Sequence, residues 1–297
     1  MLTKNKKIDF ICIGASKSGT TFISSILKND SEFYIPSIKE VNYFNEFIPQ
    51  DYVTRNINFN YSHEWYNKFF EEGLSNNQIC GELTPCYFNF DSSSKKIYDY
   101  NPEIKLFAIL RNPVERAYSQ FLYARQNGVE NSTSFIKALN SNTRKYVGES
   151  LYFKNLHPFF KIFKNHQIKI FIYDDFFENP QMHLEDLFKF LGKKNKLNSK
   201  FDFKKVNIGK ASRFSFFSRI IGKANIFLKN PNLYFLRKCL KKIGFINIVK
   251  FLKNLNLKKR KTKKPSQFEY REAQKFFIDD IRSLEKLLSI NLQKWKI

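Results

Sequence analysis

The sequence predicts an α/β protein in which helices cover both faces of a parallel sheet. Three short apolar runs, at residues 8–13, 105–110 and 167–173, are continuous enough to be strands buried on both sides. A helical pattern follows each run, and strands that alternate with helices are typical of parallel sheets. The chain has 297 residues, 42% of them hydrophobic, so it can bury a sizeable core, which excludes a disordered protein.

The first two strand–helix units follow from apolar spacing. The run IDFICI at 8–13 ends at Gly14, and residues 20–27 continue it with a helical pattern of Phe, Ile and Leu. The run KLFAIL at 105–110 ends at Arg111 and Asn112, two polar residues. Pro113 follows them, and proline suits the first turn of a helix. Both units therefore predict a strand that leads through a short loop into a helix.

The second half of the chain continues the pattern. The run QIKIFIY at 167–173 precedes a helix at 182–191, which Gly192 ends. Residues 214–258 have the pattern of basic amphipathic helices, and residues 268–295 that of a closing helical pair. We expect one domain over residues 8–297, with a basic helical C-terminal region inside it.

The basic charge is concentrated in one region. The chain carries a net charge of +24, and residues 203–268 contain 19 Lys or Arg and no Asp or Glu, which leaves +5 for the rest. The lysine-rich stretch 258–264 is expected to be an exposed loop. Such a region attracts an anionic partner, namely nucleic acid, an acidic membrane face or a charged glycan. Solvated helix faces without any partner remain an equal alternative.

The cysteine and apolar patterns indicate the compartment. Cys12, Cys80, Cys86 and Cys239 are widely spaced, which favours reduced thiols over a disulfide framework. No apolar run approaches the roughly 18–20 residues that span a bilayer, and the N-terminus lacks a signal-peptide pattern. We therefore expect a soluble cytoplasmic protein. The histidines show no paired spacing, and no metal site is expected.

The sharpest motif is the loop GASKSGTT, which joins the first strand to its helix. Small residues in such a loop let backbone N–H groups converge on an anion at the helix N-terminus. Gly14 and Gly19 keep the spacing of the nucleoside triphosphatase loop, but Thr20 stands where that motif requires lysine. The lysine is Lys17 instead. The loop therefore predicts a P-loop-type phosphate site for a nucleotide with fewer bridging phosphates.

Three motifs in the same order resemble the PAPS-dependent sulfotransferases, in particular the carbohydrate (heparan-sulfate-type) and bacterial branches. These are SKSGTT, KEVNYF and RNPVERAYS, at residues 16–21, 39–44 and 111–119. The closing helical pattern at 276–295 is also similar, so the likeness covers most of the chain. It implies that the first loop clasps the 5′-phosphosulfate of PAPS (3′-phosphoadenosine 5′-phosphosulfate). The residues implied are Ser16, Lys17, Ser18, Gly19, Thr20 and Thr21.

The strand at 105–110 delivers Arg111 to its carboxyl end, where α/β sheets hold their ligands. Asn112 is suited to cap the helix that follows, and Ser119 lies on the same helix face. The resemblance implies that Arg111 and Ser119 bind the 3′-phosphate of PAPS. For Arg116 a structural ion pair is expected ahead of a phosphate contact.

Sulfuryl transfer requires a base for the acceptor hydroxyl and a cation for the charge that develops on the leaving group. Lys17 is expected to serve the leaving group. The resemblance implies that Glu40 is the general base, and Asn42 replaces the histidine that is common nearby. A surface carboxylate paired with Lys39 is the alternative for Glu40.

The segment GELTPCY at 81–87 resembles a G-E-K-T-P-x-Y segment beside the acceptor in glycan-specific members. It implies that Glu82 and Tyr87 contact the substrate, although Leu83 replaces a lysine of that pattern, which puts a heparan-like acceptor in doubt. Farther on, Gly209, Lys210 and Arg213 fit a loop that the family closes over the cofactor.

The sequence as a whole predicts a PAPS-dependent sulfotransferase that acts on a carbohydrate-type acceptor, a glycan or a glycolipid. Peripheral contact with an acidic membrane at its inner, cytoplasmic face is a further expectation, whereas specific nucleic-acid binding is not expected. Two alternatives stay open. One is a P-loop nucleotide kinase, and the other is a non-catalytic polyanion-binding protein built on residues 203–268.

Overall fold

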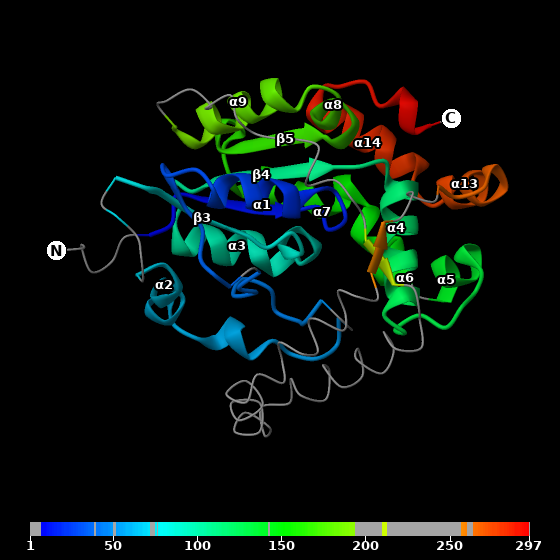
Figure 1. Cartoon of the computed structure of the whole chain (residues 1–297), viewed down its shortest axis with the longest axis horizontal. Helices are drawn as coiled ribbons and strands as arrows, with labels where there is room; N and C mark the ends of the chain where they lie inside the picture. Colours follow the sequence, from blue (N-terminus) through cyan, green and yellow to red (C-terminus); the bar gives the residue numbers. More distant parts are fainter. Residues whose placement is uncertain are drawn as a thin grey trace.

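The computed structural model describes residues 7–38, 40–49, 52–71, 75, 77–141, 143–193, 210–212, 257–259 and 264–296. Within these residues, five parallel strands form one sheet in the order β2-β3-β1-β4-β5 (Figure 1). They are β1 (Phe10–Gly14), β2 (Phe33–Tyr34), β3 (Ile79–Leu83), β4 (Lys105–Leu110) and β5 (Ile168–Ile172). A separate antiparallel pair joins β6 (Lys210–Ser212) to β7 (Leu257–Lys259).

The helices of the first half are α1 (Thr20–Lys28), α2 (His63–Glu71), α3 (Asp91–Tyr100), α4 (Pro113–Gln126), α5 (Phe135–Ser141) and α6 (Thr143–Tyr146). Those of the second half are α7 (Tyr152–Ile162), α8 (Tyr173–Glu178), α9 (Pro180–Leu191), α13 (Gln267–Gln274) and α14 (Ile278–Leu288). Short 3-10 turns lie at Ile57–Asn60, Tyr87–Asn89, Gly148–Ser150, Asn165–Gln167 and Gln293–Trp295.

The two faces of the sheet have separate apolar cores because side chains alternate along each strand. Phe10 and Cys12 of β1 pack with α1, α8 and α9, whereas Ile11 and Ile13 pack with α3, α7 and α14. Each of these four side chains is completely buried. Among the described residues, helices therefore cover both faces of the sheet.

The local signals explain where the elements start and stop. The Asn112 side chain accepts hydrogen bonds from the N–H groups of Val114 (3.0 Å) and Glu115 (3.2 Å), with Pro113 in the first turn, so the predicted cap is confirmed. Gly192 ends α9 with φ +100°, also as predicted. The closing helical pair is likewise confirmed as α13 and α14.

The structure adds elements that apolar spacing did not predict. β3 and β2 extend the sheet beyond the three predicted strands. Apolar spacing does not predict β3, because Gly81 and Glu82 interrupt its apolar run. The expected loop at 258–264 is partly wrong, since Lys258 and Lys259 belong to strand β7. Cys12, Cys80 and Cys86 are buried cysteines outside any disulfide, as expected. The basic helices expected at 214–258 lie outside the described residues, apart from the short β7 strand.

Candidate active site

The candidate site lies at the carboxyl edge of the sheet, where the loops after β1, β3 and β4 meet. The Ala15 N–H donates to the Ile109 carbonyl of β4 at 3.0 Å, and the Thr84 N–H donates to the Cys12 carbonyl of β1 at 3.1 Å. The Tyr152 hydroxyl donates to the carbonyl of Arg111 at 2.8 Å. These bonds hold the loop after β1 against β4, the loop after β3 against β1 and the loop after β4 against α7, at the edge where α/β sheets bind ligands.

The loop after β1 needs its two glycines for different reasons. A Cβ at Gly14 would lie 2.7 Å from the Phe88 ring, so the close approach of that ring excludes any side chain. Gly19 has φ +85°, and a Cβ there would meet Phe177 at 2.7 Å. Lys17 also has a positive φ, of 70°. The loop is therefore a tightly curved turn that delivers its backbone to the N-terminus of α1.

A buried polar atom at this turn fits an anionic ligand. The Ser18 hydroxyl is completely buried beside the Tyr152 hydroxyl, whose pKa is raised by burial and lowered by Ser18, and it makes no hydrogen bond of good geometry to a described residue. Buried hydroxyls almost always make such a bond, so an oxygen-rich group at the turn would supply what the side chain lacks. Thr20 is buried at the start of α1, whereas Ser16 is partly exposed and Thr21 is exposed. The turn, its hydroxyls and the helix N-terminus form a suitable cradle for a phosphate.

Lys17 reaches from this loop to α4. Its Nζ lies 3.9 Å from the centroid of the Tyr123 ring, a cation–π contact. Tyr123 is one helical turn beyond Ser119, which is itself partly exposed on α4. The ammonium of the first loop and the hydroxyl predicted to bind the 3′-phosphate therefore lie along the same helix.

Arg111 stands at the end of β4 as predicted, and it is paired with an acid. Its Nε and Nη2 donate to one oxygen of Glu115 at 3.1 and 2.6 Å, and its guanidinium lies 5.0 Å from the ring centroid of Tyr173. Burial raises the pKa of Asp174, and the negative charge of Glu115 raises it further while Arg111 lowers it. Arg111 thus pairs with Glu115 and also lowers the pKa of Asp174. A bound phosphate would share Arg111 with Glu115 or displace Glu115 from it.

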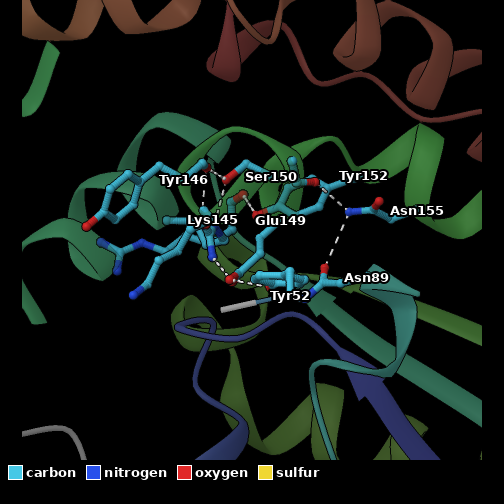
Figure 2. Close-up of polar contacts among 11 residues, drawn as sticks. Tyr52, Asn89, Lys145, Tyr146, Glu149, Ser150, Tyr152 and Asn155 are labelled. Carbon is cyan, nitrogen blue, oxygen red and sulfur yellow. Dashed lines mark hydrogen bonds and ion pairs between the residues drawn. The ribbon is translucent and has the colours of Figure 1, made fainter. Parts of the chain in front are cut away.

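Arg116 is buried deeper on the same helix, and Figure 2 labels its four partners, Lys145, Tyr146, Glu149 and Ser150. Its Nη1 donates to Glu149 at 2.6 Å, its Nε donates to the Ser150 hydroxyl at 2.6 Å, and its Nη2 donates to the carbonyls of Lys145 and Tyr146. Both ionic side chains are shielded from solvent. The expected structural ion pair is confirmed, with Glu149 as its acid.

Glu40 lies on an exposed, strained part of the chain next to the loop after β3. It has φ +61°, and its carbonyl accepts a hydrogen bond from Asn42 Nδ2 at 2.7 Å. The Cys86 thiol donates to Asn42 Oδ1 at 3.3 Å. Burial raises the pKa of Cys86 well above its usual value, and the nearby carboxylate of Glu40 raises it further. Glu40 is therefore exposed beside the carboxyl edge, where its role as base stays a prediction.

The structure places Glu82 in the interior. Its carboxylate accepts hydrogen bonds from the hydroxyls of Tyr66 (2.6 Å), Thr84 (2.8 Å) and Tyr87 (2.9 Å). Burial raises the pKa of Glu82, and these donors oppose the shift. Tyr87 is also completely buried, and its hydroxyl accepts the N–H of Tyr43 at 2.9 Å. Direct substrate contact by Glu82 or Tyr87 stays a prediction, which their burial disfavours.

Comparison with known proteins decides the family. The sequence model of the sulfotransferase domain matches residues 7–241, most of the chain. The chain belongs to the sulfotransferase family.

Similar sulfotransferases differ in length and source. The membrane-associated sulfotransferase kil1 of Dictyostelium discoideum is 37% identical over 120 residues, which cover 40% of this chain and 23% of that protein. Human heparan sulfate glucosamine 3-O-sulfotransferase 5 is 27% identical over 191 residues, 61% of this chain and 52% of that protein. The chain thus spans about half or less of these relatives.

The fold of this chain agrees with that of a solved structure. A sulfotransferase from Alicyclobacillus acidocaldarius superposes with a TM-score of 0.68 at 20% identity, and the match covers 99% of this chain and 100% of that one. The predicted α/β class is therefore confirmed, with a parallel sheet flanked by helices.

Some residues of the site were not foreseen, or cannot be placed. Tyr123 and Glu149 follow no motif, and only their contacts with Lys17 and Arg116 reveal them. Gly209 and Arg213 lie outside the described residues, and Lys210 is described only as part of strand β6. In the described part of the chain, no helix has the length and apolar character needed to cross a membrane, and no group of acidic, Cys and His side chains is arranged to hold a metal.

Proposed function

We propose that this chain is an active PAPS-dependent sulfotransferase that modifies a hydroxyl of a carbohydrate-type acceptor. The observation that carries the proposal is the tightly curved turn after β1, where the buried Ser18 hydroxyl lies at the N-terminus of α1. Arg111 adds a cation at the end of the neighbouring strand β4. The family generally uses PAPS, and an anion cradle next to a second cation suits a nucleotide with separated phosphate groups.

The chain's own residues divide into two binding groups. Ser16, Lys17, Ser18, Gly19, Thr20 and Thr21 would hold the 5′-phosphosulfate through backbone N–H groups, hydroxyls and one ammonium. Arg111 and Ser119 would hold the 3′-phosphate, with a guanidinium fork and a hydroxyl donor. Gly209, Lys210 and Arg213 would close over the nucleotide.

The donor supplies an activated sulfuryl group. The acceptor hydroxyl oxygen forms a new bond to sulfur while the bond from sulfur to the 5′-phosphate oxygen breaks. Glu40 takes the proton of that hydroxyl, and Lys17 stabilises the negative charge that remains on the phosphate. Glu40 is suited to this because it is exposed at the carboxyl edge.

The two alternative functions make different demands on the same chain. A P-loop kinase would need a lysine at position 20, where this chain has Thr20, and would bind ATP with Mg²⁺ in preference to PAP (3′-phosphoadenosine 5′-phosphate). A non-catalytic polyanion-binding protein would bind DNA with a steep salt dependence and would not bind PAP. PAP affinity therefore separates both alternatives from the sulfotransferase.

The acceptor is proposed to be a glycan or glycolipid. Several relatives are named as heparan sulfate sulfotransferases, which supports a sugar acceptor, and one of them is named a 3-O-sulfotransferase, which supports a hydroxyl of that sugar. The test is incubation with labelled PAPS and a panel of cell-surface glycans, followed by mass analysis. We expect a mass increase of one sulfuryl group and release of PAP. Absence of transfer to all panel members, together with absence of PAP binding, would contradict the proposal.

We further propose peripheral contact with acidic lipid at the cytoplasmic face of the membrane. The acid-free region 203–268 with 19 basic residues supports it, as does the name of a relative, which is called membrane-associated. Sedimentation with acidic and neutral liposomes tests it. Binding to acidic liposomes alone, weakening as salt rises through about 0.1–0.5 M, is the expected result. Absence of binding to acidic liposomes at low salt would leave the region a solvated surface.

A further inference from the structure

The segment that carries Glu40 forms one internally bonded loop, which we call the Glu40 loop (residues 40–49 and 52–61). The Asn56 side chain donates to the carbonyls of Asn42 at 2.6 Å and Asn45 at 2.8 Å. Backbone bonds also join Ile48 to Thr54 at 2.9 Å across the loop. A displacement of the 52–61 half is therefore transmitted to the half that carries Glu40.

Tyr52 anchors this loop to the rest of the molecule. Its side chain is buried, its ring stacks on Phe90 with centroids 5.4 Å apart, and its hydroxyl donates to Glu149 at 2.6 Å. Tyr52 also has φ +60°, a backbone conformation that residues other than glycine rarely adopt. Burial raises the pKa of Tyr52 well above its ordinary value and Glu149 raises it further, so the hydroxyl remains a donor.

Glu149 connects Tyr52 to helix α4. One carboxylate oxygen of Glu149 accepts from Tyr52 (Figure 2), and the other accepts from Arg116 at 2.6 Å. Arg116 lies on α4 between the two residues proposed for the 3′-phosphate, Arg111 and Ser119. The side chains of Arg116, Glu149 and Tyr52 thus form a continuous buried chain of contacts from α4 to the Glu40 loop.

A second observation places the same two regions close together. The buried Cys86 thiol has its pKa raised by burial first and then by the carboxylates of Glu40 and Glu149. The Cys86 thiol also donates to Asn42 Oδ1 at 3.3 Å, so Cys86 contacts the Glu40 loop directly. The Glu40 loop is thus attached to the rest of the molecule at two places, by Tyr52 through Glu149 and by Asn42 through Cys86.

We propose that Tyr52 is a positioning residue: its hydroxyl holds the Glu40 loop in a fixed position relative to α4, through Glu149 and Arg116. The proposal rests on the proposed role of Glu40 as the base. The path would set where the Glu40 carboxylate stands relative to the donor groups of α4. Because small displacements of a catalytic group cost rate more than affinity, the hydroxyl of Tyr52 is expected to affect turnover and not donor binding.

The test compares Tyr52→Phe with a matched control. Tyr52→Phe removes only the hydroxyl, so the ring still stacks on Phe90 and Glu149 keeps Arg116. The control is Tyr146→Phe, which also removes a buried tyrosine hydroxyl donating to a carboxylate, here Glu130 at 2.9 Å, outside the Glu40 loop. Turnover is followed as PAP release from PAPS, with water or the best glycan of the panel as acceptor, and PAP affinity by calorimetry.

We expect Tyr52→Phe to lower kcat by about ten- to a hundredfold while PAP affinity stays within about twofold. Tyr146→Phe is expected to keep kcat within about twofold of the parent. Hydrogen exchange in residues 40–61 should accelerate in Tyr52→Phe alone, which gives a second readout if the variant is less stable. An unchanged kcat together with unchanged exchange in Tyr52→Phe overturns the proposal, and so do equal losses in both variants.

A double variant separates positioning from general support of the fold. In a Glu40→Gln background, Tyr52→Phe should cause no further loss, because Tyr52 acts through Glu40. A full additional loss in that background would show that Tyr52 acts by another route and overturns the inference while Glu40 remains the base. If Glu40→Gln alone keeps the parental kcat, the proposed base is wrong, and the inference that rests on it falls with it.

Discussion

Replacement of Arg111 by alanine should weaken the binding of PAP much more than that of adenosine 5′-phosphosulfate, which lacks the 3′-phosphate. Charge-assisted hydrogen bonds contribute about 1.5–3 kcal/mol each, and the guanidinium can offer two to a phosphate. Part of that gain is offset because Arg111 already donates twice to Glu115, at 3.1 and 2.6 Å. A net loss of about 2–3 kcal/mol remains, which corresponds to about 30- to 150-fold weaker PAP binding.

Titration calorimetry of both nucleotides measures the difference. Ser119→Ala, which removes one neutral hydroxyl, should weaken PAP binding by about fivefold. Arg125→Ala is the matched control, because it removes the same charge from the far end of α4 and should change neither nucleotide by more than about twofold. Equal losses for PAP and adenosine 5′-phosphosulfate in Arg111→Ala would refute the assignment of the 3′-phosphate.

Three further predictions follow from the site and its supports. Lys17→Ala should keep the fold but reduce kcat by about a hundredfold or more, measured as PAP release, since it removes the cation facing the leaving group. Arg116→Met should destabilise the protein by about 3–5 kcal/mol in urea unfolding, because it leaves the buried Glu149 carboxylate without its counter-charge. Burial raises the pKa of Glu82, so the native state holds this proton more tightly than the unfolded state and loses stability as pH rises through the raised pKa. Urea unfolding at pH 4 and pH 7 should show that loss in the parent but not in Glu82→Gln.

The sequence predicted those parts of the fold that local pattern determines. β1, β4 and β5 are continuous apolar runs, and Asn112, Pro113 and Gly192 are local stop and start signals. Glu82 lies in the strand that was missed. Its burial is stabilised by the hydroxyls of Thr84 and Tyr87, which are near it in the sequence, and by that of Tyr66 on helix α2, which no sequence pattern connects to Glu82.

The site divides in the same way. Lys17 and Arg111 follow from a loop and a strand end, which are local features that the structure places at the same edge of the sheet. The pairing of Arg116 with Glu149 joins residues 33 positions apart, and Tyr52 reaches Glu149 from 97 positions away. Such contacts depend on the tertiary fold, because no periodicity connects the residues that make them.

The most direct test of the proposed activity is the binding of PAP to the purified chain, with ATP and Mg²⁺ titrated in parallel. A donor site built from the turn after β1 and from Arg111 predicts saturable PAP binding with one site per chain, and much weaker binding of ATP with Mg²⁺. Binding should fall in Arg111→Ala and persist in Glu40→Gln, since Glu40 is proposed to act on the acceptor. Tight binding of ATP with Mg²⁺ and none of PAP would contradict the account and favour a nucleotide kinase.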